Sequence, residues 1–372
     1  MKLLRIRASN YKNCCDDFTI DLVAKSKKTS EDKEYELQEI AEDLYAFNTA
    51  AFVGKNASGK TSALELMECG YSILSEFRLE DKHYNYDNVK LEIIFYYEDY
   101  IYKYDTILKA DSNLGNKANF TDQHIYRKKY YKSKIKEIYS DEGFEEITGL
   151  GELPEDTSII FFVLKKKATR AVYFNCDGEG ADSYHLMFRA MKTYKISETV
   201  LMKVIKIFDD KIKNLAMVDE KHYKLEYQDC VKELSDSELV YMLSSGTTKG
   251  ILLYIFVVAA LKNGFDLLID EVENHFHKTL VENMISLFKD RTVNRRSATL
   301  IFTTHYCEVL DLFNRQDNIW IAKSDHKIRL DNMYESYNIR PELLKSRQFY
   351  NNAFDTAVSY EDLMALKKEL MR

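Results

Sequence analysis

The sequence contains little proline and glycine, and its cysteines do not follow the spacing of a bridged or zinc-bound protein. Only two prolines and twelve glycines occur in 372 residues. The six cysteines form no CxxC pair and no zinc-finger spacing, and the first residues contain no apolar signal-peptide core. We therefore expect a protein of the reducing cytoplasm.

Long apolar runs and a strong charge of one sign are also missing. The longest apolar segment, "GILLYIFVVAALKNG", is interrupted by Lys262 and Gly264, short of the about 18 uncharged residues that a membrane helix needs. The net charge of −7 excludes a protein that coats nucleic acid over its whole surface. We expect no membrane span. The net charge is still compatible with a local basic groove.

The composition is that of a folded α/β protein. Hydrophobic residues make up 45% and charged residues 30%, as in soluble globular chains, and 27 tyrosines and 20 phenylalanines indicate many half-buried strands. In the second half, apolar strands alternate with helical runs of ten or more residues. This alternation predicts a parallel sheet with functional loops at the carboxyl ends of its strands.

The pattern along the chain predicts one large head and a short tail. Residues 1–335 form the head and 336–372 a C-terminal helical segment. Within the head, 1–110 and 237–335 read as the core, and the more polar stretch of about 111–236 reads as an inserted, mainly helical lid. No repeat or sustained heptad pattern occurs, which excludes a long coiled coil.

A phosphate-binding loop is predicted at "FVGKNASGKT". An apolar strand, a loop fitting GxxxxGK[ST] and a helical pattern follow one another, which favours this interpretation over an ordinary glycine turn. Glycines let the backbone N–H groups wrap phosphates, Lys60 reaches the β and γ phosphates, and Thr61 can bind Mg²⁺. The residues predicted to hold the nucleotide here are Gly54, Lys55, Asn56, Ala57, Ser58, Gly59, Lys60, Thr61 and Ser62.

Two carboxylates follow the apolar strand in "GFDLLIDEVENHFH". We predict that Asp270 binds the Mg²⁺ ion and that Glu271 is the base that polarises the attacking water. Acidic residues can also open a helix, but the phosphate loop favours the catalytic interpretation. His275 and His277 form an H-x-H pair with no third ligand at a recognisable spacing, so we favour a contact surface over a zinc site.

A third element, "LSSGTTKG", places small hydroxyl residues before a long helical run. Its helix N-terminus suits a phosphate, and we predict that Ser244, Ser245 and Gly246 contact the nucleotide. A structural N-cap explains Ser244 or Ser245 equally well.

The ordered set GxNxxGKT, LSSGT, an apolar strand ending in DE, and "FTTH" is similar to ABC-type ATPases, particularly the SMC/RecF and OLD-like branch. The resemblance implies an ABC-type P-loop head that hydrolyses ATP with Mg²⁺. It implies a homodimer or higher homo-oligomer in which ATP lies between the phosphate loop of one copy and LSSGT of the other. His305 matches the switch histidine of the family, and Glu271 its catalytic base. The Q-loop glutamine has no secure match, since Gln123 lies in a segment without clear pattern.

Within that branch, residues 1–110 and 237–325 look most like compact ATPases of bacterial abortive-infection and anti-phage systems. The resemblance implies a switch that controls a separate effector, a nuclease or a toxin. The stretch after His305 is shorter than a typical domain of about 100 residues, so the effector is not expected on this chain. The amphipathic end of segment 336–372 can dock such a partner or pack on its own domain.

Basic clusters leave a second function open, an ATP-dependent, RecF-like DNA-binding repair protein. Tyrosines interleave the first cluster, as in surfaces that stack nucleic-acid bases, although most charge runs are solvated faces. A transporter ATPase subunit is a third, weaker match. The clusters comprise Arg127, Lys128, Lys129, Lys132, Lys134 and Lys136; Lys165, Lys166, Lys167 and Arg170; and Arg295 with Arg296.

Overall fold

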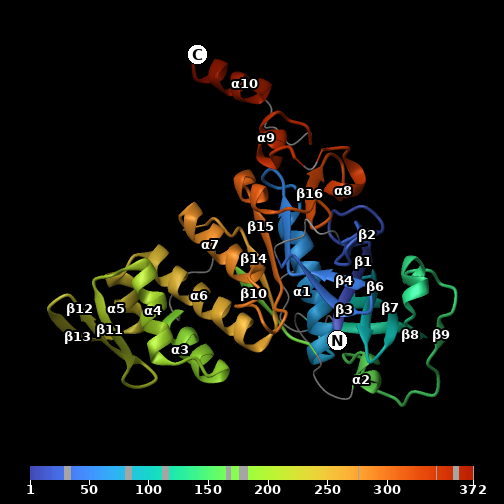
Figure 1. The fold of residues 1–372 in the computed structure, drawn as a ribbon, viewed down its shortest axis with the longest axis horizontal. Helices are drawn as coiled ribbons and strands as arrows, with labels where there is room; N and C mark the ends of the chain where they lie inside the picture. The colour runs from blue at the N-terminus through green and yellow to red at the C-terminus, as the bar shows by residue number, and fades with distance from the viewer. Residues whose placement is uncertain are drawn as a thin grey trace.

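The computed structural model describes residues 1–28, 35–79, 86–110, 117–164, 169–175, 183–274, 276–340, 342–354 and 360–371. Within them the fold is mixed α/β, as predicted, with an antiparallel sheet and a mainly parallel sheet on either side of helix α1 (Figure 1). A lobe of helices and short strands lies to one side, and the C-terminal helices lie at the end of the molecule opposite the chain's N-terminus.

The antiparallel sheet has the order β2-β1-β6-β7-β8-β9. The turn between β6 and β7 is tight: Glu98 and Asp99 have φ angles of 46° and 65°, the left-handed pair that suits a short hairpin. A small hairpin, β3 (Leu37–Ala41) and β4 (Leu44–Phe47), lies beside this sheet. The strands of the sheet are β1 (Lys2–Ser9), β2 (Phe18–Asp21), β6 (Val89–Tyr97), β7 (Tyr100–Ala110), β8 (Ala118–Lys129) and β9 (Glu145–Glu146).

The second sheet has the order β10-β14-β15-β5-β16-β17, with parallel pairing from β10 to β16 and an antiparallel β17. Parallel strands end at the same edge, so the loops after β5, β14 and β15 come together there. The strands are β5 (Thr49–Val53), β10 (Ala171–Asn175), β14 (Asp266–Asp270), β15 (Leu300–Thr304), β16 (Ile319–Ser324) and β17 (Ile328–Asn332).

Both faces of this sheet are buried. Helix α1 (Lys60–Glu76) covers one face, and α6 (Ser245–Asn263) and α7 (Lys278–Lys289) cover the other. Alternate strand residues therefore point into separate cores: Phe52 packs on the α1 side and Val53 on the α6 side. This explains why the central strands read as continuous apolar runs.

The lobe is smaller and less helical than the predicted insertion of about 111–236. Strand β8 pairs with β7 and β9, and β10 pairs with β14, so three strands of that stretch belong to the core sheets. The polar sequence of β8 concealed it, because many of its side chains are solvent-accessible. We propose a narrower lobe, 183–243. It contains α3 (Ser183–Tyr194), α4 (Glu198–Phe208), β11 (Ile212–Met217), β12 (His222–Tyr227), β13 (Cys230–Ser235) and α5 (Asp236–Met242).

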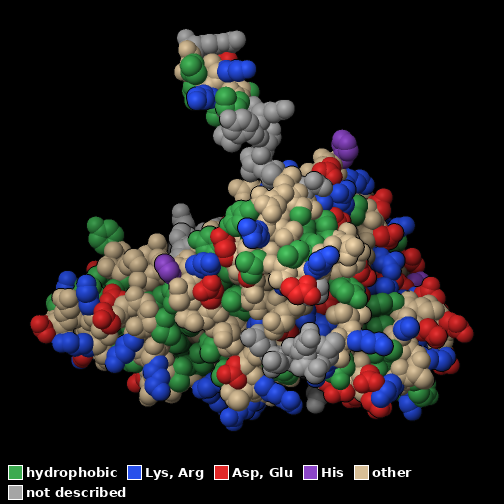
Figure 2. Space-filling model, turned by 45° about the horizontal axis from the view of Figure 1, so that its top comes forward, with side chains coloured by type: hydrophobic (Ala, Val, Ile, Leu, Met, Phe, Trp, Pro, Cys, Tyr) green, Lys and Arg blue, Asp and Glu red, His purple; other side chains and the backbone are tan. Residues whose placement is uncertain are grey.

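The predicted C-terminal helix is present as α10 (Tyr360–Leu370), which projects away from the rest of the molecule (Figures 1 and 2). Its Leu366 and Leu370 side chains are 59% and 80% exposed. The shorter elements outside the sheets are η1 (Lys132–Glu137), α2 (Ile160–Val163), η2 (Cys307–Leu312), α8 (Met333–Ser336) and α9 (Lys345–Tyr350).

Helix α6 is the one helix of the described residues that is long and apolar enough to cross a membrane by length and composition. Of its most apolar window, 67% is buried inside the structure, between the parallel sheet and the lobe. Burial of this kind is typical of a core helix.

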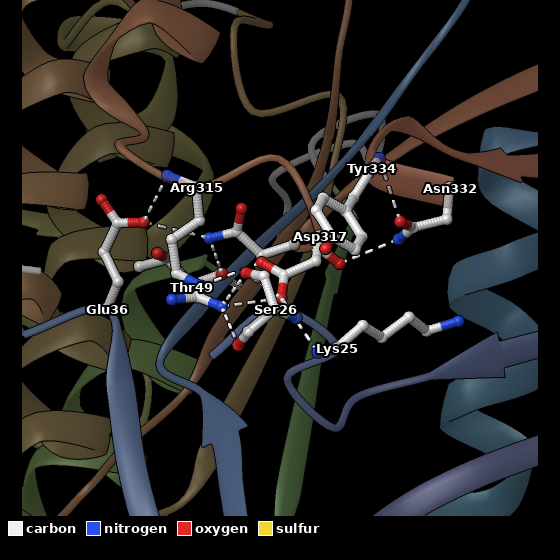
Figure 3. A network of polar contacts seen from close by, with 9 residues as sticks. Lys25, Ser26, Glu36, Thr49, Arg315, Asp317, Asn332 and Tyr334 are labelled. Carbon is white, nitrogen blue, oxygen red and sulfur yellow. Dashed lines mark hydrogen bonds and ion pairs between the residues drawn. The ribbon is translucent and has the colours of Figure 1, made fainter. Parts of the chain in front are cut away.

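A buried ionic network lies at the amino-terminal edge of the parallel sheet, opposite the edge at which β5, β14 and β15 end (Figure 3). The guanidinium of Arg315 donates to both carboxylate oxygens of Asp317, at 2.9 and 2.8 Å, and both residues are buried. Backbone N–H groups of Lys25 and Ser26 also donate to Asp317. Because each ion is paired and hydrogen-bonded, the network fastens the N-terminal segment to the base of β16.

Candidate active site

The phosphate loop connects β5 to α1 and needs both of its glycines. A Cβ atom at Gly54 would lie 2.5 Å from the carbonyl oxygen of Ala322, and one at Gly59 would lie 2.2 Å from the Ile328 side chain. Gly59 also has a φ of 96°, in the left-handed region that favours glycine. The loop therefore packs tightly on β16 and β17, and its shape is set by the core.

Lys60 folds back into this loop. Its ammonium nitrogen donates to the carbonyl oxygens of Gly54 and Lys55, each at 3.1 Å. Burial lowers the pKa of Lys60, and the charges of nearby Glu271, Glu273 and Asp270 partly oppose that shift. A cation held by backbone carbonyls at this position is ready to pair with an anion.

Asp270 ends β14 and is held by neutral hydroxyl donors. Thr303 Oγ1 donates to Asp270 Oδ1 at 2.6 Å, and the Tyr173 hydroxyl lies 3.4 Å from Oδ2. Burial and the charge of Asp270 raise the pKa of Tyr173, so the hydroxyl remains a donor. The same Thr303 oxygen accepts the Glu271 N–H at 2.6 Å. Thr303 therefore fixes two adjacent acidic residues at once.

Glu271 and His305 extend the cluster across two strand ends. Glu271 has a φ of 48°, in the left-handed region of the backbone. Glu271 Oε1 lies 3.8 Å from His305 Nε2, and Asn274 donates to Glu271 Oε2 at 2.5 Å. His305 Nδ1 lies 3.5 Å from Lys60 Nζ. The predicted base, histidine and lysine thus lie together.

Two polar residues of the cluster, Thr303 and Tyr173, were missed at the sequence level. Thr303 precedes the histidine within "FTTH" and was visible as a neighbour of a predicted residue, while Glu273 lies in "ENHFH", which the family resemblance assigns to the D-loop. Tyr173 comes from β10, inside the stretch read as an insertion, and no local pattern pointed to it. Only the pairing of β10 with β14 brings it to Asp270.

The signature residues lie at the amino end of α6, on the lobe side. Ser244 is the N-cap, and its Oγ accepts the Thr247 N–H at 3.0 Å. Ser244 and Ser245 are exposed, and Gly246 is half-buried. Figure 1 shows α6 running from the lobe to the start of β14. The capping role of Ser244 is therefore present within one chain.

Gln123 and His277, the second histidine of the H-x-H pair, make structural hydrogen bonds. Gln123 Oε1 accepts from the Tyr104 hydroxyl at 2.7 Å and from the Ile159 N–H at 2.9 Å, which ties β8 to α2. His277 caps α7 by accepting the Thr279 N–H, and His275 lies outside the described residues. Across the part of the chain that the structure describes, no group of three or more His, Cys, Asp or Glu residues is arranged to hold a metal.

The first basic cluster is partly neutralised. Lys132 pairs with Glu42 and Asp43 at 3.0 and 2.8 Å, and Lys128 donates to the carbonyl oxygens of Glu137 and Ser140. Two further cations lie over rings: Arg127 is 5.3 Å from the Tyr100 centroid and Lys129 is 5.8 Å from that of Tyr131, while Lys134 and Lys136 are exposed. In the other clusters, Arg170 covers Tyr194 and Arg295 donates to Thr292, and Arg296 is exposed; Lys165, Lys166 and Lys167 lie outside the described residues.

No family model matches the chain, and no curated protein matches its sequence. Among solved structures it is similar to the SMC head domain from Thermotoga maritima, with 10% identity and a TM-score of 0.40, over 89% of this chain and 99% of that one. It is also similar to an SMC head bound to the C-terminal winged-helix domain of ScpA, with 11% identity and a TM-score of 0.47, over 89% and 97%. These are likenesses of fold. The chemistry of the site rests on the residues described above.

Proposed function

We propose that this chain is an Mg²⁺-dependent ATPase of the ABC type that hydrolyses ATP to ADP and phosphate. One observation carries the proposal: Lys60, at the start of α1 after β5, lies beside His305 and Glu271, which directly follow the neighbouring strands β15 and β14, and the three side chains form a connected cluster at one sheet edge. A cation, a base and a histidine beside a phosphate loop are the parts that phosphoryl transfer to water requires.

The residues present fit a nucleotide and a magnesium ion. Ser58 Oγ is buried without a hydrogen-bond partner, and it lies inside the loop that would wrap phosphates. Thr61 is exposed in the first turn of α1, and the Asp270 carboxylate is held by Thr303, so both suit Mg²⁺. When bound, the metal would neutralise phosphate charge. Lys60 would then leave its carbonyl partners for the phosphates, and Glu271 would accept a proton from the attacking water.

The active form in this proposal is a dimer that encloses ATP. Ser244, Ser245 and Gly246 are accessible at a helix N-terminus, a place that favours anions. They lie at the start of α6, beside the lobe, and not in the phosphate loop of the same chain. A second copy would bring them to the γ-phosphate held by Lys60, and two equivalent sites would form.

A hydrolysis-blocked variant tests this proposal. Glu271→Gln with ATP and Mg²⁺ should elute as a dimer in light-scattering chromatography, and Lys60→Ala should remain a monomer that binds no ATP. The Ser244→Arg variant should bind ATP through its own phosphate loop and stay monomeric, because the substitution blocks only the surface that would contact the nucleotide of a second copy. Normal ATP turnover in both Lys60→Ala and Glu271→Gln would overturn the assignment.

We further propose a cytoplasmic switch of a bacterial anti-phage system, in which nucleotide-dependent closure controls a separate nuclease or toxin. The resemblance of the motifs supports this role, and α10 offers an exposed apolar face, including Leu366 and Leu370, for such an effector. Plaque assays with the chain and its neighbouring gene should show protection that Lys60→Ala abolishes. Protection that survives this change would contradict the switch.

A DNA-binding repair protein remains a second candidate. The observation that favours it is the exposed Arg127 and Lys129 beside tyrosine rings, with Tyr131 54% exposed. Affinity for DNA should fall steeply with salt, and Arg127→Ala should reduce the slope by about 1. Lys132→Ala is the matched control, because Glu42 and Asp43 already neutralise Lys132. Salt-independent affinity, or no affinity, excludes this function.

A further inference from the structure

Glu273 is a buried carboxylate that the proposed reaction does not use. It lies two residues beyond Glu271 in the loop after β14, and only 8% of it is exposed. A carboxylate buried in this way is unfavourable unless its oxygens are hydrogen-bonded or paired with a cation. The contacts of its two carboxylate oxygens therefore indicate the role of Glu273.

The first oxygen of Glu273 is bound to the chain at the end of β15. Oε1 accepts the backbone N–H of His305, and the neighbouring Val272 N–H donates to the carbonyl oxygen of Thr303 at 3.0 Å. The loops after β14 and β15 are thus joined side by side. The second oxygen, Oε2, is buried and has no hydrogen-bond partner.

The hydrogen bond that the His305 N–H donates to Glu273 is shorter than either contact of the His305 imidazole. The imidazole contacts are long, 3.5 Å to Lys60 and 3.8 Å to Glu271, and each is weaker than a hydrogen bond of ordinary length. A backbone N–H bound to a carboxylate is charge-assisted and roughly twice as strong as a neutral bond. The main chain at residue 305 therefore sets where the imidazole lies.

We propose that Glu273 is the positioning residue for His305, acting through the backbone N–H of residue 305 and without touching the nucleotide. The inference rests on the proposed ATPase function for its kinetic consequence, and the contact itself exists without nucleotide. Glu273→Gln retains a carbonyl oxygen that can accept the same N–H. Glu273→Ala removes it.

A spectroscopic experiment tests the contact in nucleotide-free protein. Selective ¹⁵N-histidine labelling gives an amide signal for His305, assigned by its loss in His305→Ala. The signal should move upfield in Glu273→Ala, and less in Glu273→Gln, because the bond to a charged acceptor is lost or weakened. An unchanged signal in folded Glu273→Ala, or in Glu273→Gln should the alanine variant not fold, would overturn the proposal.

Kinetics test the consequence. Glu273→Ala should lower kcat about 10-fold with KM unchanged within about twofold. In the His305→Ala background, Glu273→Ala should lower kcat by less than about a further twofold, because both changes disturb the same arrangement. Glu273→Gln should keep most activity, and Glu282→Ala on α7 is the control. Fully additive effects, or Glu273→Gln as slow as Glu273→Ala, would refute positioning. Wild-type protein that hydrolyses no ATP would instead refute the proposed function and leave the spectroscopic test standing.

Discussion

The Nδ1 atom of His305 lies 3.5 Å from the ammonium nitrogen of Lys60. An ammonium group has donors and no acceptor, so Nδ1 must accept and the proton of the neutral ring must be on Nε2. That N–H faces Glu271 Oε1, at 3.8 Å. The contact with Lys60 therefore favours the tautomer of the neutral histidine that presents its Nε2–H to the proposed base.

Replacement of His305 should affect turnover more than binding. We expect His305→Ala to lower kcat about 100-fold, because in the proposed reaction His305 would lie beside the transferred phosphate and the base and would act mainly in the transition state. ATP affinity should change only a few-fold, as measured by equilibrium binding beside phosphate release. His326→Ala, on the exposed turn between β16 and β17, is the control. A raised KM with unchanged kcat would contradict this role.

Thr303 should matter both for stability and for the metal. Its buried hydroxyl donates to Asp270 and accepts from the Glu271 N–H, so Thr303→Val leaves both groups without that partner. We expect a loss of about 1–3 kcal/mol in unfolding free energy and a higher Mg²⁺ requirement for hydrolysis. Thr303→Ser keeps the hydroxyl and should retain the Mg²⁺ requirement of the wild type; an equal defect in both variants would argue against the bridge.

The buried Arg315–Asp317 pair should be essential for the N-terminal attachment. Asp317→Asn leaves a buried guanidinium without its counter-charge, and we expect a loss of about 3–5 kcal/mol in urea unfolding. Asp325→Asn is the matched control. It removes an exposed partner of Arg329 and should cost less than about 1 kcal/mol. Similar losses in the two variants would mean that burial does not decide the energy of these pairs.

Tyr241 should lie at the proposed dimer interface. It is 94% exposed on α5, three residues before Ser244, while the preceding Leu239 is buried and a capping box between Ser235 and Glu238 holds the helix. Tyr241→Ala should weaken ATP-dependent dimerisation about 10-fold, as expected for a central aromatic contact. Monomer stability should change by less than about 0.5 kcal/mol. Sedimentation in the Glu271→Gln background measures this, and an unchanged dimer would place the interface elsewhere.

His124 should make a small contribution to stability that depends on pH. Hydrogen bonds to Glu146 and then Asp122 raise the pKa of His124 above its ordinary value. The stabilisation is therefore complete below a pH of about 6.5 and is lost as the pH rises through the folded-state pKa. His124→Gln should lower stability by less than about 1 kcal/mol in acid, because the site is exposed, and should equal the wild type in mild alkali. Denaturant unfolding across pH checks the sign.

Several elements were predictable because their signals are local. The glycines and lysine of the phosphate loop, the strand ending at Asp270 and the left-handed turn at Glu98 and Asp99 each depend on a few adjacent residues. Strands β8 and β10 were not assigned to the core, and the membership of β10 depends on a partner far along the chain, β14. The sequence of β10 is short and that of β8 is polar, so both were assigned to the insertion.

The amino-acid sequence alone determined the mixed α/β class and which residue types stand at each strand end, because backbone preference and apolar periodicity are properties of short segments. The tertiary structure decided which of those ends meet. The order β14-β15-β5 brings Lys60, His305 and Glu271 together, and parallel pairing with β10 adds Tyr173. The order of strands in a sheet depends on contacts along the whole chain that bury both of its faces. These contacts form only when the complete core packs.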